Sequence, residues 1–284
     1  MSIRLKGFRL SLLVLVAVLL TVQAVSAHSI YVQSGRFKVS EGRSTPMFFG
    51  FGHHFPVDDA VRSKKLNYIK VYHPDGKVTD VGIKDEKSLH SYNLTYEKAG
   101  THAITAETNP GYFAMYIDKK GRKRHSLKPM NTFINNAEKV LTSLRSSQWA
   151  KTYVVAEEPT VPFPANIGLP MEIVPLRDVT GLKIGDTVDF QIYNEGKPYT
   201  GKGTWDATYN GFSTEAEDMY IPRTVVEGGK FSLKISNSDR WFIRYFTKVD
   251  AKGSEKELFK QNKRTATLVF QVRNERKRPK PKSH

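Results

Sequence analysis

A histidine that follows a candidate export-signal cleavage site offers unusual metal-ligand chemistry. Residues 25–27 are small, as a signal peptidase requires before its cut, so the mature chain is predicted to begin at His28. An amino-terminal His presents two nitrogens at one residue, its α-amine and its ring Nδ1, which together close a chelate around one ion. Divalent transition ions such as nickel and copper favour nitrogen ligands. The start of the mature chain is therefore a candidate metal site.

Two adjacent histidines supply candidate third donors. His53 and His54 follow Gly52, a residue type that lets backbone segments approach closely. Side chains of neighbouring strand residues point to opposite faces, so at most one of the two shares the side of His28 unless the strand has ended. His102 is a weaker candidate from a later strand. The predicted metal ligands are His28, His53, His54 and His102, and solvated or structural histidines are the alternative interpretation.

A predicted hairpin brings the mature start close to the double His. Strand-like runs lie on both sides of a turn at residues 41–42, and antiparallel pairing about that turn sets His28 opposite Phe55. A bulge at residues 34–35 would shift this register by one or two residues. Asp58 and Asp59 follow the double His as candidate oxygen ligands, although a solvated turn is the favoured interpretation.

The elements that must position these residues are predicted to be mostly β. Short runs bounded by turn residues recur about every ten residues, which favours two Ig-like antiparallel β-sandwich domains. Residues 131–151 contain no Gly or Pro and carry apolar side chains at helical spacing, so we predict one helix packed on the first domain. The predicted organisation is a signal peptide (1–27), an N-terminal Ig-like domain (28–158), a Pro-rich crossover (159–170), a C-terminal sandwich (171–273) and a basic, disordered tail (274–284).

Composition and the amino-terminal segment indicate an exported protein. Arg4, Lys6 and Arg9 precede an apolar run, which is the order of a secretory signal. The run of about 13 residues would span roughly 20 Å as a helix, too short for a hydrocarbon core of about 30 Å. We therefore expect a periplasmic protein released by cleavage. Its net charge of +16 favours an anionic membrane surface as a partner, and no nucleic-acid motif is present.

No arrangement of residues indicates catalysis. The chain has no Cys, no nucleophile elbow, no phosphate-binding Gly loop and no paired histidines flanking a Glu on a helix. Glu157 and Glu158 are adjacent, which in a strand places them on opposite faces rather than as an acid and base pair. We predict a binding protein rather than an enzyme.

Four stretches together resemble the DUF4198 family of exported proteins, which are described as periplasmic components of nickel or cobalt uptake. The stretches are the export signal ending before His28, the Gly-His-His-Phe-Pro segment at 52–56, the segment at 168–176 and the Gly-Lys-Pro segment at 196–198. The resemblance implies an Ig-like β protein that binds or delivers a divalent transition metal near an uptake system of the inner membrane.

The resemblance also assigns roles by position. His28 and His53 match the family's histidines at the mature start and after Gly. The chain departs from the pattern within residues 240–248, where relatives often carry a His and this sequence reads Trp-Phe-Ile-Arg-Tyr-Phe from position 241. If that His is a ligand in relatives, this chain has lost it or replaced it with His54 or His102.

The leading hypothesis is a periplasmic metal-binding accessory protein that supports uptake by a membrane transporter. Nickel or cobalt is the expected ion, and copper is the alternative. A copper monooxygenase is a second hypothesis, because such enzymes pair an amino-terminal His with another His on an Ig-like sandwich. The absence of disulfides and of a flat aromatic surface argues against it. A non-metal adhesion or ligand-binding β module is the third.

Overall fold

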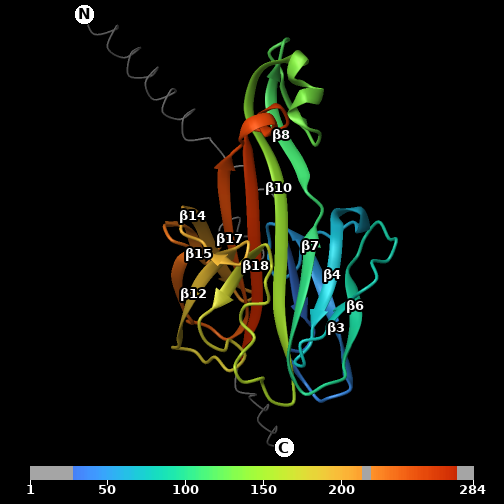
Figure 1. The fold of residues 1–284 in the computed structure, drawn as a ribbon, viewed down its shortest axis with the longest axis vertical. Helices are drawn as coiled ribbons and strands as arrows, with labels where there is room; N and C mark the ends of the chain where they lie inside the picture. Colours follow the sequence, from blue (N-terminus) through green and yellow to red (C-terminus); the bar gives the residue numbers. More distant parts are fainter. Residues whose placement is uncertain (1–27, 213–218, 274–284) are drawn as a thin grey trace, which may run out of the picture.

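The protein is built from three β-sheets. The computed structural model describes residues 28–212 and 219–273, and Figure 1 shows that strands dominate this part of the chain. The predicted mostly β, sandwich-like fold is confirmed. The predicted signal peptide and basic tail lie outside the described residues. Within the described ranges, no helix is long and apolar enough to cross a membrane.

The largest sheet has 11 strands and runs through both halves of the chain. Its main path is β15 (Ile221–Val226), β14 (Gly203–Tyr209), β17 (Asp239–Asp250), β18 (Gln261–Val272), β10 (Ala137–Ala156), β7 (Gly100–Thr108), β4 (Leu66–Tyr72) and β5 (Val78–Asp80). Three further strands join it, namely β2 (Lys38–Val39), β8 (Gly111–Asp118) and β9 (Lys123–Ser126). Because β10 pairs in parallel with β18 and antiparallel with β7, it joins the two halves along the middle of Figure 1.

Two smaller sheets cover opposite faces of the large one. The first comprises β1 (Ser29–Ser34), β3 (Arg43–Gly52) and β6 (Ser91–Tyr96), and the second comprises β11 (Met171–Pro175), β12 (Thr187–Asn194), β13 (Lys197–Pro198) and β16 (Lys230–Lys234). Side chains alternate between faces along a strand. On β10, Ala150 and Val154 pack in the core under the first sheet, whereas Trp149 and Tyr153 pack under the second. The domain boundary expected at residue 158 stays a prediction, but the large sheet continues across it.

The prediction of a helix for residues 131–151 is wrong. Two short 3₁₀ turns, η2 (Met130–Thr132) and η3 (Ile134–Asn136), lead directly into the 20-residue strand β10. Residues 137–156 contain three Val and two Thr, β-branched residues that fit a pleated surface better than a helix. Strands β8, β7 and β18 supply backbone partners along its whole length. The remaining 3₁₀ turns are η1 (Ser63–Lys65) and η4 (Gly253–Glu257).

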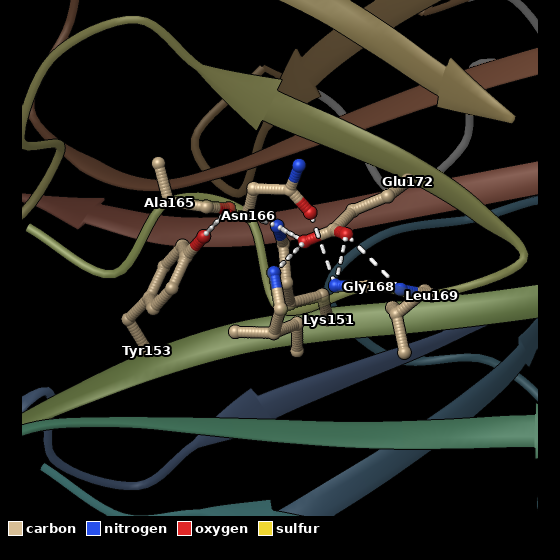
Figure 2. A network of polar contacts seen from close by, with 8 residues as sticks. Lys151, Tyr153, Ala165, Asn166, Gly168, Leu169 and Glu172 are labelled. Carbon is tan, nitrogen blue, oxygen red and sulfur yellow. Dashed lines mark hydrogen bonds and ion pairs between the residues drawn. The ribbon is translucent and has the colours of Figure 1, made fainter. Parts of the chain in front are cut away.

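A buried ion pair fixes the Pro-rich crossover against the large sheet (Figure 2). The Lys151 Nζ lies 2.5 Å from the Glu172 Oε1, and both side chains are at most 1% exposed. Glu172 also accepts hydrogen bonds from the backbone N–H groups of residues 167–169. Lys151 and the Tyr153 hydroxyl both donate to the Ala165 carbonyl. This network satisfies every buried charge in it, so the segment that carries part of the family resemblance has a structural role here.

Candidate metal-binding site

The imidazole rings of His28 and His53 lie against each other at one end of the hairpin. Their centroids are 4.7 Å apart with an interplanar angle of 63°, and the Phe51 ring packs edge-on 5.3 Å from His28. Ser29 pairs with Gly52 across β1 and β3, so the next residue outward on each strand is a histidine. The structure therefore brings together two of the four predicted ligands.

The observed register differs by two residues from simple pairing about the turn. Arg43 N–H donates to the Ser40 carbonyl, which is the expected tight turn, but Gly35 N–H donates to the Pro46 carbonyl. The first strand thus has two more residues than its partner between these two points. They bulge outward where β2 leaves β3 to pair with β10. This bulge moves the residue opposite His28 from Phe55 to His53.

Strand β10 fixes the beginning of β1. The Gln148 side chain donates to the His28 carbonyl at 2.9 Å and accepts from the Ile30 N–H at 2.8 Å. The Thr267 hydroxyl of β18 donates to the Ile30 carbonyl at 2.8 Å. β1 is the edge strand of its sheet, so one side of its backbone has no neighbouring strand. These side-chain bonds satisfy backbone groups on that side and hold the backbone at His28 against the large sheet.

Asp58 organises the loop that carries the double His. Its carboxylate accepts the backbone N–H groups of His53 at 2.6 Å, His54 at 2.7 Å and Asp59 at 2.9 Å. A Cβ at Gly52 would lie 2.0 Å from an oxygen of this carboxylate, so only Gly fits there. Desolvation acts to raise the pKa of Asp58, but these N–H donors outweigh it and hold the pKa below its usual value. The Asp58 carboxylate thus acts as a turn anchor.

The His54 ring lies beside Asp58. Because β3 ends at Gly52, the two histidines are no longer constrained to opposite strand faces. The His54 Nδ1 lies 3.4 Å from the Asp58 Oδ2, and its carbonyl accepts the Tyr31 hydroxyl at 3.1 Å. His54 is therefore adjacent to His53 in sequence, but the partner of its ring is Asp58.

His102 is not near the pair. It is fully buried on β7, its Nε2 is 2.8 Å from the Lys98 carbonyl, and its ring packs against His73 at a centroid distance of 5.2 Å. Desolvation lowers the pKa of both His73 and His102. His102 pairs with Val154 of β10, whereas Gln148 of the same strand binds His28. A strand rises about 3.3 Å per residue, so these positions are roughly 20 Å apart.

The structure brings two imidazole rings together. No group of three or more His, Cys, Asp or Glu side chains in residues 28–212 and 219–273 is placed to hold a metal ion. If a signal peptidase cuts before His28, as the sequence predicts, the α-amine of His28 becomes a third nitrogen donor. The arrangement would then offer three nitrogens from two residues.

A family model described as "Domain of unknown function (DUF4198)" matches residues 25–249, well over half of the chain. The chain belongs to the DUF4198 family. The match includes His28, the loop of the double His and the Glu172 segment. No curated protein matches the chain at a significant level.

Several solved structures match this DUF4198 chain at low identity and low TM-score. They are an Escherichia coli alpha-2-macroglobulin activated by porcine elastase (12% identity, TM-score 0.24, 87% of this chain and 20% of that one), Clostridium thermocellum CbhA fibronectin(III)-like modules (9%, 0.20, 89% and 100%) and a red sea bream transglutaminase (7%, 0.19, 88% and 32%). The chain spans about a fifth of the macroglobulin's length. At these values the likeness carries no argument about function.

The segment in which this DUF4198 chain departs from the family pattern forms the middle of β17. Arg244 is 4% exposed and forms two hydrogen bonds to the Asp206 carboxylate, one of them from Nε to Oδ1 at 3.0 Å. Its Nη1 lies 3.3 Å from the hydroxyl of Ser29, the residue after His28. Our sequence interpretation passed over Arg244 as one of many scattered basic residues. Its position inside an apolar strand was the available signal.

Proposed function

We propose that this protein is a periplasmic accessory that binds nickel or cobalt as cargo and delivers it to a membrane transporter. The observation that carries the proposal is the contact between the His28 and His53 rings at the predicted start of the mature chain. The α-amine and ring of His28 and the ring of His53 supply nitrogen donors of the kind that these ions favour. The resemblance to exported proteins that are described as periplasmic components of nickel or cobalt uptake points to the same assignment.

Calorimetric titration of the mature chain beginning at His28 tests the proposal. We expect one equivalent of nickel or cobalt to bind, and we expect one added Ala before His28 to weaken binding at least about tenfold. His53→Ala should weaken binding similarly, whereas the matched variant His54→Ala should not, because the His54 ring lies beside Asp58. Unchanged affinity in the extended chain would reject the chelate.

The same titrations separate the alternatives. Preferential copper binding with reductant-driven oxidation of a polysaccharide would favour a monooxygenase, which uses the same nitrogen donors. Failure of nickel, cobalt and copper to bind would leave the adhesion or ligand-binding module.

An arm formed by residues 111–146 supports the membrane-proximal part of the proposal. Strand β8, β9 and the first half of β10 project beyond the two sandwiches in Figure 1. Between Asp118 and Lys139 the chain carries seven Lys or Arg and two acidic residues. Leu127 is 72% exposed among them. Basic side chains with exposed apolar residues suit an anionic lipid surface, where each Lys or Arg contributes about 1 kcal/mol.

Sedimentation with vesicles tests the role of the arm. Lys123→Glu with Lys128→Glu should reduce binding to phosphatidylglycerol vesicles at least about tenfold, because two charges are reversed. Lys64→Glu with Lys87→Glu makes the same charge change at exposed positions outside the arm and is the matched control. Equal loss in both variants would show that only net charge matters, and binding to neutral phosphatidylcholine would contradict the electrostatic mechanism.

A further inference from the structure

The large sheet opens along one edge of β10, between β18 and β2. Strand β18 pairs with β10 as far as Thr152 and Val269, and β2 joins the same edge where Val155 pairs with Lys38. In the described part of the chain, the two β10 residues between these pairs have a strand partner only on their other edge, where β7 lies. A cavity of about 210 Å³, lined by residues of all three strands, lies at this opening near the lower end of β10 in Figure 1.

Aromatic rings form the buried wall of the cavity. Phe37 precedes β2, Tyr153 lies on β10 and Phe270 lies on β18, and these three side chains are at most 9% exposed. The Tyr153 hydroxyl donates to the Ala165 carbonyl at 2.8 Å, so this wall presents no unsatisfied hydroxyl. The cavity has about the volume of seven water molecules at roughly 30 Å³ each. A space of this size with aromatic walls suits the apolar part of a small ligand.

Charged side chains of both signs line the same cavity. Lys38 and Glu158 form an ion pair at 3.0 Å and balance each other. Asp178 lies close to the aromatic wall, because burial and then the charges of Glu172 and Asp178 raise the pKa of the Tyr153 hydroxyl. The cavity thus combines an apolar wall with an ionic rim.

Asp178 and Arg273 are the charges of this rim that lack an ionic partner within residues 28–212 and 219–273. The Asp178 Oδ1 accepts the backbone N–H and the hydroxyl of Thr180, both at 2.7 Å, and these bonds fix the carboxylate on its loop. Its second oxygen and the Arg273 guanidinium remain available to a ligand. A carboxylate and a guanidinium at one cavity complement a molecule that carries an ammonium and a carboxylate.

We propose that this cavity binds a small zwitterion of the class of α-amino acids with an apolar side chain. The ligand ammonium pairs with Asp178, its carboxylate accepts hydrogen bonds from the Arg273 guanidinium, and its side chain packs against the three rings. The site is distinct from the proposed metal ligands, because Val155 is roughly 20 Å along β10 from Gln148, which holds His28, at about 3.3 Å per residue. The inference does not depend on metal binding.

Calorimetric titration of the mature chain with L-phenylalanine, phenethylamine and 3-phenylpropanoate tests this inference. The three compounds share one ring, but phenethylamine lacks the carboxylate and 3-phenylpropanoate lacks the amine. We expect one equivalent of L-phenylalanine to bind at least about tenfold more tightly than either analogue. Equal affinity for all three compounds would mean that the cavity recognises only the ring and would overturn the zwitterion site. Failure of both L-phenylalanine and the smaller L-leucine to bind would also overturn it.

Two substitutions of similar shape assign the charges. Asp178→Asn keeps an oxygen for Thr180 and should weaken L-phenylalanine and phenethylamine at least about tenfold, without affecting 3-phenylpropanoate. Arg273→Gln should weaken L-phenylalanine and 3-phenylpropanoate and leave phenethylamine unaffected. Asp85→Asn and Arg62→Gln, at exposed positions that do not line the cavity, are the matched controls. Thermal unfolding confirms that each variant is folded. If both cavity variants bind L-phenylalanine as the parent does, the proposed recognition by charge is wrong.

Discussion

Two buried lysines on opposite faces of the same sheet have contrasting environments. Lys151 forms an ion pair with Glu172 and a hydrogen bond to the Ala165 carbonyl, and Glu172 is in turn satisfied by three backbone N–H groups. The Lys263 ammonium lies 5.0 Å from the centroid of the Phe246 ring, and burial together with the charges of Arg244, Lys248 and Arg223 lowers its pKa to about 7, although Asp206 acts in the opposite direction. Both are at most 5% exposed, so burial alone does not distinguish them.

The difference lies in the balance of charge and hydrogen bonds. A buried charge that is paired and fully hydrogen-bonded holds a structural element, as Glu172 holds the crossover against β10 (Figure 2). A buried charge without an anion has a cost that the folded protein alone does not offset. The Lys151 network is therefore a structural clamp, whereas the burial of Lys263 costs stability when its amine is protonated.

Replacing Lys151 should produce the largest effect. Lys151→Met leaves the Glu172 carboxylate buried without its cation, which is expected to lower the free energy of unfolding by about 3–5 kcal/mol. Urea denaturation at pH 7 measures this. The double variant Lys151→Met with Glu172→Gln removes the uncompensated charge and should recover part of the loss. A change below about 1 kcal/mol in the single variant would contradict the clamp.

Replacing Lys263 should act in the opposite direction. Lys263→Met removes an unpaired buried charge and is expected to raise the free energy of unfolding by roughly 3 kcal/mol at pH 7 in the absence of ligand. The pKa of Lys263 is about 7 when folded and about 10.4 when unfolded, so the unfolded chain binds the extra proton between these values. Stability of the parent protein therefore rises with pH across this window.

Urea denaturation at pH 6.5 and pH 10 checks the sign. The advantage of Lys263→Met should be full at the lower pH and should be much smaller at pH 10, close to the unfolded pKa of about 10.4 above which Lys263 is neutral in both states. Lys256→Met should be neutral at both pH values, since Lys256 is exposed. A destabilised Lys263→Met variant would mean that the amine has an anionic partner, and the contrast with Lys151 would fail.

The contact of His28 with His53 was partly predictable from sequence. The turn at residues 41–42 and the alternation of strand residues were enough to bring the mature start to the double His. The choice between His53 and His54 depended on a two-residue bulge and on Asp58 capturing the loop. Both are tertiary features, because β2 leaves the hairpin only when β10 offers it a backbone partner.

Other features could not be read from local patterns. Residues 137–156 combine helical spacing with a β-favouring composition, and only the partners on both sides decided in favour of a strand. The sequence predicted that His102 lies in a strand. It did not predict how far His102 lies from His28 along the sheet, because that distance depends on how β7 pairs with β10 in the whole topology. Lys263 is one basic residue among 44 in the sequence, and its burial depends on the place of β18 inside the large sheet.

Replacing Asp58 should produce the smallest change in stability, and it tests whether burial is what makes the Glu172 network strong. Like Glu172 it accepts three backbone N–H groups, but its side chain is 18% exposed and its loop lies at the surface. Asp58→Asn should therefore lower the free energy of unfolding by only about 1 kcal/mol at pH 7. Asp59→Asn is the matched control, because the Asp59 side chain is exposed and only its N–H contributes to the loop.

The pH dependence of the Asp58 effect follows from the same bonds. The pKa of Asp58 is lower in the folded protein than in the unfolded chain, so its stabilising contribution is complete above about pH 4 and is lost as pH falls through the folded pKa. Urea denaturation of the parent and Asp58→Asn at pH 7 and pH 3 should show the difference narrowing at the lower pH. If Asp58→Asn were instead as damaging as Lys151→Met, an exposed carboxylate would act as strongly as a buried one. Burial would then not be what makes the Glu172 network a clamp.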